Sequence, residues 1–170
     1  AIQIATAEGA SVIGFERSRD NYLGHTNKPV DIVNLQNETD IHSAIMNRTN
    51  GKGADIIMNT VGSPYFDVAC NSMAKQGRQI IISTLIEENL INLRTFYRGN
   101  YKMIGVSNMD HNNIISGELL EEMKTGFESG LYKPYPIKKK NIYKLEEAKK
   151  AYGIVLNGST RDRIIINPNQ

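Results

Sequence analysis

Several apolar runs of this sequence end in small or polar residues, and these endings are where chemistry is expected. The run at 56–58, for example, is followed by Asn59 and closes on Gly62. Ligands bind beyond the carboxyl ends of parallel strands, where glycine and small polar groups let them approach the backbone. We therefore predict a ligand along one edge of a sheet; the alternative is that these are ordinary turn residues. The endings comprise Glu16, Thr60, Val61, Gly62, Ser83, Thr84, Gly105, Val106 and Ser107.

Charged residues follow the first expected strand. An acid at the position of Glu16 can accept hydrogen bonds from ribose hydroxyls, which favours NAD. The guanidinium of Arg17, together with Ser18 and Arg19, can instead pair with a 2′-phosphate, which favours NADP. A third interpretation is a solvated charged turn. The residues alone leave these alternatives open.

Other reactive side chains give no site. His25, His42 and His111 lack metal-ligand spacing. Cys70 is the single cysteine, so the sequence has no disulfide framework and no cysteine-based zinc cluster. Tyr65 and Ser107 are possible proton donors, but neither has an identifiable partner. We therefore predict no catalytic residue and no zinc in this chain.

The elements that position the strand ends alternate along the chain. Short apolar runs predict strands at 11–16, 30–35, 54–61, 78–85 and 101–107, and the run at 56–58 is expected to be buried on both faces. Helical spacing predicts a first helix that ends at Gly9 and whose start is not in the chain. Further helices are expected at 92–98, 115–130 and 144–158, before a last strand near 162–168. Short parallel strands covered on both faces define an α/β sheet.

Two helices carry specific end signals. One is expected to begin at a cap on Asn37, with Glu38 and Asp40 in its first turn, and to end at Gly51. The next is expected to begin at Ser63 with Pro64 in its first turn, and to end at Gly77.

Composition sets the broad class. The chain has 170 residues, 40% of them hydrophobic and 22% charged, and a net charge of +2. These values are ordinary for a soluble globular protein, and they indicate neither nucleic acid nor a membrane surface as partner. No run reaches the roughly 18 apolar residues of a membrane span, and no signal peptide is visible. We expect a cytoplasmic protein.

Four segments, in order, resemble the cofactor-binding half of medium-chain dehydrogenases/reductases. "AIQIATAEGASVIGFERS" is similar to that family's first helix and second strand, and "GKGADIIMNTVGSPYFDVACNSMAKQGRQIIISTL" to its next strand-helix-strand unit. "FYRGNYKMIGVS" resembles the approach to the last sheet strand. "GLYKPYPIKKKNIYKLEEAKKAYGIVLNGSTRDRIIINP" resembles the C-terminal return segment. The similarity is greatest to the quinone oxidoreductase-like branch, which generally uses NADPH without zinc.

The resemblance implies a Rossmann-like, doubly wound parallel sheet that lacks its first strand and glycine-rich loop. Residues 1–132 would be a partial dinucleotide-binding domain, and 133–170 a return segment that packs on an absent catalytic domain. By resemblance, residues 16–18 bind the adenosine half of the cofactor and 60–62 its middle. Residues 83–85 and 105–107 approach the nicotinamide. Arg161 and Arg163 could reach a cofactor phosphate or belong to a charged hairpin.

The implied function is part of an NAD(P)H-dependent oxidoreductase that reduces a quinone or a carbonyl compound, with NADPH favoured over NADH. The isolated chain is expected to be inactive. The last sheet strand often pairs between subunits in this family, so the resemblance allows a homodimer through that strand. One alternative is a non-catalytic nucleotide-binding or dimerisation module of the same fold. A methyltransferase, which has a related α/β fold, is disfavoured by the C-terminal match.

Overall fold

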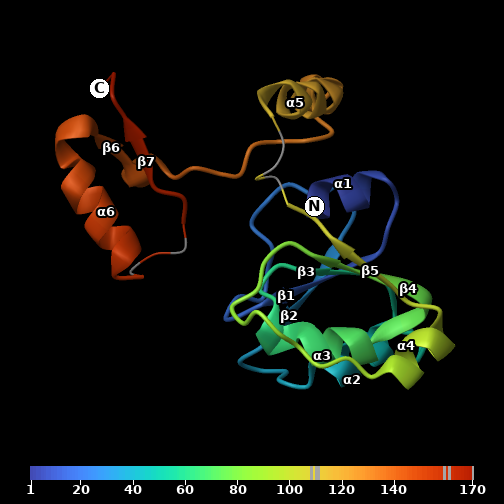
Figure 1. Ribbon diagram of the computed structural model, residues 1–170. Helices are drawn as coiled ribbons and strands as arrows, with labels where there is room; N and C mark the ends of the chain where they lie inside the picture. The colour runs from blue at the N-terminus through green and yellow to red at the C-terminus, as the bar shows by residue number, and fades with distance from the viewer. Residues whose placement is uncertain (108, 110–111, 159, 161, 170) are drawn as a thin grey trace. The chain divides into compact units, whose positions relative to one another are not determined.

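The computed structural model describes residues 1–107, 109, 112–158, 160 and 162–169 (Figure 1). They form two compact units. The sheet unit consists of Val12–Tyr22 and Val30–Thr125, and the terminal unit of Ala1–Ser11, Leu23–Pro29 and Gly126–Gln170. The predicted boundary between 1–132 and 133–170 concerns a catalytic domain outside this chain and stays a prediction.

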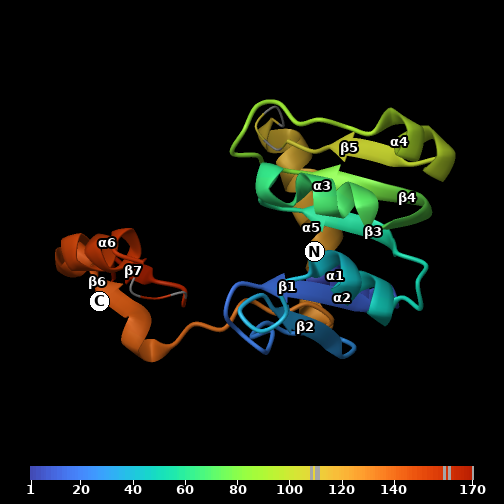
Figure 2. The same cartoon turned by 90° about the horizontal axis from the view of Figure 1, so that it is seen from below.

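The sheet unit contains five strands, all paired in parallel. β1 (Val12–Glu16) pairs with β2 (Val30–Asn34), and β4 (Met73–Ile81) lies between β3 (Ala54–Asn59) and β5 (Lys102–Gly105). Figure 2 shows the arrowheads of β1, β3, β4 and β5 pointing the same way. The predicted α/β class with parallel strands is confirmed, and the strand ends chosen from the sequence lie at one edge of the unit.

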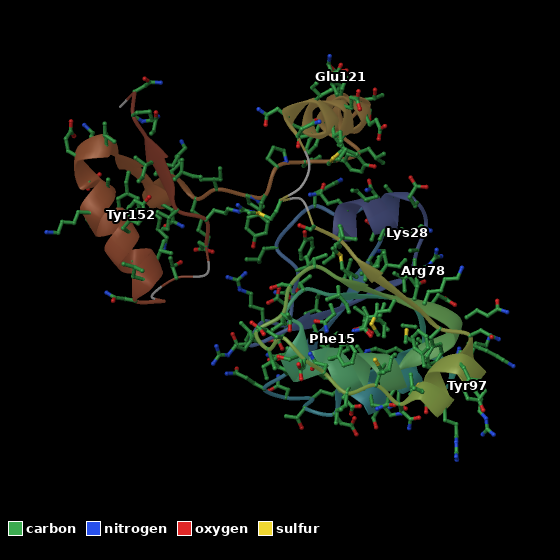
Figure 3. The ribbon with its side chains drawn as sticks, viewed as in Figure 1. Phe15, Lys28, Arg78, Tyr97, Glu121 and Tyr152 are labelled. Carbon is green, nitrogen blue, oxygen red and sulfur yellow. The ribbon has the colours of Figure 1, made fainter. Side chains whose placement is uncertain are left out.

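Three helices lie along one face of this sheet unit in Figure 1: α2 (Ile41–Arg48), α3 (Ser63–Asn71) and α4 (Leu93–Gly99). Phe66 and Ala69 of α3, with Ala44 and Ile45 of α2, supply buried core residues. α4 buries none of its residues fully, and Tyr97 points away from the sheet (Figure 3). The longest helix, α5 (Asn113–Glu128), follows β5 in the chain.

The predicted cap of α2 is wrong. The helix begins after Asp40, whose Oδ1 accepts a hydrogen bond from the backbone N–H of Ser43 at 2.9 Å. Asn37 lies outside the helix and donates from Nδ2 to Asp20 at 3.4 Å. Glu38 lies outside it too, paired with Arg48 at 2.9 Å. Both residue types suit a helix start, so their spacing alone did not distinguish them.

The predicted end of α3 is also wrong. Gly77 reads as a helix stop, but α3 ends at Asn71 and β4 already begins at Met73. A methyl group added at Gly53 would lie 2.7 Å from the backbone of Met73 and Ala74. Met73 pairs with Ala54 across β3 and β4, and the carbonyl of Ser72 accepts from the N–H of Ala54 at 2.9 Å. Local sequence signals do not show this pairing of segments distant in sequence.

The predicted burial of β3 on both faces is not observed. Ile56 is 52% exposed and Met58 43% exposed. Among the described residues, β3 has a strand neighbour on one edge only, β4, and β1 likewise pairs only with β2. Alternate side chains of a strand point to opposite faces, so Ile56 and Met58 share one face of β3, and the described residues cover that face only partly. The pairings among the described strands make the sheet unit two separate parallel ladders.

The terminal unit is built from short elements. It contains α1 (Ile2–Ala7), η1 (Lys139–Asn141), β6 (Ile142–Lys144), η2 (Leu145–Glu147), α6 (Ala148–Leu156) and β7 (Ile165–Asn167). β6, which was not predicted, pairs in parallel with β7. The side chain of Gln3 bonds both backbone groups of Lys133 at 2.8 Å, and the buried hydroxyl of Thr6 accepts from the N–H of Asn27 at 3.2 Å.

Candidate functional site

Asn59, the last residue of β3, shapes the turn that follows it. Its side chain accepts hydrogen bonds at Oδ1 from the backbone N–H of Val61 at 3.1 Å and of Gly62 at 2.8 Å. Its Nδ2 donates to the carbonyl of Gly62 at 2.9 Å. Asn59 is only 6% exposed, so these bonds satisfy polar groups in a buried place. The polar ending of this apolar strand therefore stabilises the turn itself.

Gly62 brings two strand ends together. Its φ is 89°, a left-handed value that favours glycine. A methyl group here would overlap the Cα of Thr84 and lie 2.6 Å from the carbonyl oxygen of Ser83. The turn after β3 therefore packs directly on the segment after β4, and no larger residue fits at Gly62.

The end of β5 joins the same edge. The N–H of Val106 donates to the carbonyl of Ile81 at 2.9 Å, which continues the ladder one residue beyond β5. Asn59, Ile81 and Gly105 are partners across the three strands, so the three ends are in register. The predicted segments 60–62, 83–85 and 105–107 thus all follow neighbouring strands at one edge.

An open hollow of about 240 Å³ lies at this edge. The hydroxyl of Ser63, the first residue of α3, is buried at its wall and has no hydrogen-bond partner among the described residues. A buried polar atom without a partner is uncommon and marks a place where a ligand atom or a water can bind. The lining residues are Gly62, Ser63, Phe66, Ile81, Thr84, Glu87 and Asn89.

The predicted residues differ in what their side chains do. Thr84 uses its hydroxyl within its own loop, donating to the carbonyl of Ile86 at 2.7 Å. Ser107 accepts from the N–H of Met109 at 3.1 Å, and Leu85 is 77% exposed. A methyl group at Gly105 would meet no atom within 4 Å, so no close approach requires glycine there.

The end of β1 forms the second part of the edge. The carbonyl of Glu16 accepts from the N–H of Leu35 at 2.9 Å, and the side chain of Arg17 is exposed. Asp20 lies four residues after Glu16, and its Oδ1 accepts from Nδ2 of Asn34 at 3.0 Å. Asn34 ends β2 and was not singled out from the sequence, although a polar residue that ends an apolar strand is the same signal that marked Asn59.

No zinc site is found in the part of the chain that the structure describes, because no three His, Cys, Asp or Glu side chains gather there. His42 lies 3.0 Å from the hydroxyl of Ser72, and His25 buries Nε2 without a partner. Burial, with a smaller contribution from the charge of Asp67, raises the pKa of the Cys70 thiol, which disfavours the thiolate that a metal needs. His111 lies outside the described residues.

The basic residues near the C-terminus are only partly described. Arg161 lies outside the described residues, and the guanidinium of Arg163 lies 5.6 Å from the ring centre of Tyr135. No helix among the described residues is long and apolar enough to cross a membrane.

Comparison with known proteins gives a consistent result. Residues 1–125 match the family model described as zinc-binding dehydrogenase. The chain is 24% identical to the highly reducing polyketide synthase AN6791 of Emericella nidulans over 177 residues, which cover 98% of this chain and 7% of that protein. It thus spans only a small part of this relative's length.

Solved structures match with similar coverage. A NAD-dependent alcohol dehydrogenase is 23% identical with a TM-score of 0.74, over 98% of this chain and 46% of that one. The Escherichia coli quinone oxidoreductase, crystallised with NADPH, is 18% identical with a TM-score of 0.71, over 99% of this chain and 52% of that one. These similarities show a shared fold, and this chain spans about half of each structure.

Proposed function

Because the chain belongs to the zinc-binding dehydrogenase family, we propose that it is the cofactor-binding part of an NAD(P)H-dependent oxidoreductase. The observation that carries this proposal is the packing of Gly62 on Ser83 and Thr84, which joins two parallel strand ends at one edge. A ligand laid across that edge meets backbone and small side chains. This is the arrangement in which open α/β sheets bind nucleotides.

The residues present fit such a cofactor. The turn 60–62, held by Asn59, would lie against the middle of the nucleotide, and the unpartnered hydroxyl of Ser63 would donate to or accept from it. The hollow lined by Thr84 and Glu87 would take the nicotinamide side. When bound, the nicotinamide supplies the hydride, and this chain orients the ring and excludes water from one side of it.

We further propose that NADPH is preferred to NADH. The fold does not decide between them, because one similar structure is NAD-dependent and another was solved with NADPH. The exposed guanidinium of Arg17, next to Ser18 and Arg19, is what supports the choice of NADPH.

The acceptor that we propose is a quinone or an activated carbonyl compound. The described part of this chain contains no group of side chains suited to zinc, so no step is assigned to a metal here. We expect the protein to act in the cytoplasm. A homodimer through β5 is also proposed, since β5 pairs with a described strand, β4, on one edge only.

Ligand protection tests the cofactor role. The midpoint of thermal unfolding of the 170-residue chain should rise with millimolar NADPH, and less with NADH. Gly62→Val should abolish the NADPH effect, because its side chain would displace the segment at Ser83 and Thr84. Gly51→Ala is the control, since Gly51 lies outside this edge, also has a positive φ, and its added methyl group meets no described atom within 4 Å; it should keep the effect. No protection of the wild-type chain by either nucleotide would overturn the proposal.

Turnover distinguishes the enzyme part from a non-catalytic module of the same fold. The chain alone should not consume NADPH with a quinone, because no catalytic acid is found among its described residues. Consumption by the chain alone would place the complete chemistry on these residues and contradict that expectation.

A further inference from the structure

The turn that follows β1 is anchored at both ends. At its start, the carbonyl of Glu16 accepts from the N–H of Leu35 at 2.9 Å. At its end, Oδ1 of Asp20 accepts from Nδ2 of Asn34 at 3.0 Å and from Nδ2 of Asn37 at 3.4 Å. Only residues 17–19 lie between these anchors, so the two ends restrict where their side chains can point.

Asn34 is the centre of this arrangement. It is only 9% exposed, and its Oδ1 accepts from the N–H of Gln36 at 3.0 Å while its Nδ2 donates to Asp20. The opposite orientation of the amide would place oxygen against the carboxylate and NH₂ against an N–H, so both contacts select one orientation. An aspartate here would face Asp20 with a second carboxylate, and an alanine would leave Asp20 and the Gln36 N–H without these bonds.

We infer that Asn34, acting through Asp20, is a positioning residue for recognition of the 2′-phosphate of adenosine by residues 17–19. The inference rests on the proposed function. A guanidinium binds phosphate best through two parallel hydrogen bonds, which require a defined direction of approach. A turn fixed at Glu16 and Asp20 supplies that direction, whereas a loosened turn keeps the charge of Arg17 and loses its orientation.

If Asp20 acted only through its charge, its removal would strengthen binding of the 2′-phosphate. Removing a carboxylate from beside Arg17 and Arg19 makes the turn more positive, which by itself strengthens binding of a phosphate dianion. If Asp20 acts by holding the turn, its removal weakens that binding instead. The sign of the change therefore distinguishes positioning from simple charge.

The test uses two small probes, 2′,5′-ADP and 5′-AMP, titrated calorimetrically into the 170-residue chain. Wild type should bind 2′,5′-ADP more tightly. Asp20→Ala and Asn34→Ala should each lower the ratio of the two affinities roughly tenfold, about the effect of one charge-assisted hydrogen bond. The double variant should lower it no further, because both changes remove the same contact. Asp31→Ala removes a carboxylate of β2 that pairs with Arg48 and not with the turn, so it is the matched control and should leave the ratio unchanged.

Every other outcome would contradict either the inference or the proposed function. An unchanged or raised ratio in Asp20→Ala overturns the inference, as do additive losses in the double variant. Asp20 is exposed, so this variant should keep its circular dichroism spectrum even if Asn34→Ala unfolds. Equal binding of both probes by wild type would remove the 2′-phosphate role while leaving nucleotide binding intact. Failure to bind either probe, or NADPH, would instead overturn the proposed function itself.

Discussion

Replacing Gly62 by alanine should lower the free energy of unfolding of the sheet unit more than replacing a glycine whose added methyl group would meet no neighbouring atom. Two costs add at this position. The backbone of Gly62, with φ of 89° and ψ of −126°, lies in a region that is nearly restricted to glycine, and it costs a residue with a Cβ about 1–3 kcal/mol. The overlap with Thr84 and the carbonyl of Ser83 adds the cost of overpacking, about 1–3 kcal/mol. We expect a loss of about 2–6 kcal/mol in the free energy of unfolding.

Two other glycines of the same unit separate these costs. Gly51 has φ of 75° and no atom within 4 Å of an added methyl group, so Gly51→Ala should cost only the backbone term, about 1–2 kcal/mol. Gly117 lies within α5 with open space around it, and Gly117→Ala should stabilise the protein by about 0.5–1 kcal/mol. Gly51→Ala therefore gives the cost of replacing a glycine of positive φ without a steric overlap, and Gly62→Ala should exceed it.

The assay is urea unfolding followed by circular dichroism, with equal slopes required for the comparison of free energies. If Gly62→Ala costs no more than Gly51→Ala, the segments after β3 and β4 are not in contact. The argument that Gly62 joins two strand ends would then be wrong, and with it the main support for the proposed cofactor site.

Three further predictions concern single side chains. Hydrogen bonds from the backbone and hydroxyl of Ser43 lower the pKa of Asp40 below its ordinary 3.8. Asp40→Ala should therefore lower the unfolding midpoint near neutral pH, and the difference should vanish as acid protonates the carboxyl, as thermal scans across pH would show. Burial, then Asp67, raises the pKa of the Cys70 thiol above 9.0, so iodoacetamide should alkylate it more slowly than free cysteine, and Asp67→Asn should raise that rate only slightly. Arg48→Lys should cost about 1 kcal/mol in urea unfolding, because lysine cannot reproduce a fork that contacts two carboxylates.

The local sequence pattern was sufficient to place those helices and strands that are determined by their own residues. The strands β1, β2, β3 and β5 and the helix α4 were placed within a few residues, because apolar runs and helical spacing carry that information. The strand end at 60–62 was chosen because polar residues and a glycine follow an apolar run, and ligand binding there stays a prediction.

The sequence was insufficient where distant segments decide the outcome. Met73 lies within the helix predicted from Ser63 to Gly77, yet it pairs with Ala54 in a strand ladder. Asn34 acts through Asp20, which lies 14 residues earlier in the chain, and neither residue forms a recognisable motif. Exposure of Ile56 depends on what packs on its face of the sheet, which no property of the run itself reveals.

The single-sided pairing of β1 and β3 has a consequence for handling the protein. Each of these strands presents a row of backbone N–H and C=O groups to which no described strand is bonded, and β3 adds the exposed side chains of Ile56 and Met58. Such rows are templates on which other polypeptides add strands, so aggregation should increase with concentration. A polypeptide that occupied both rows would suppress that aggregation and unite the two ladders into one cooperative folding unit.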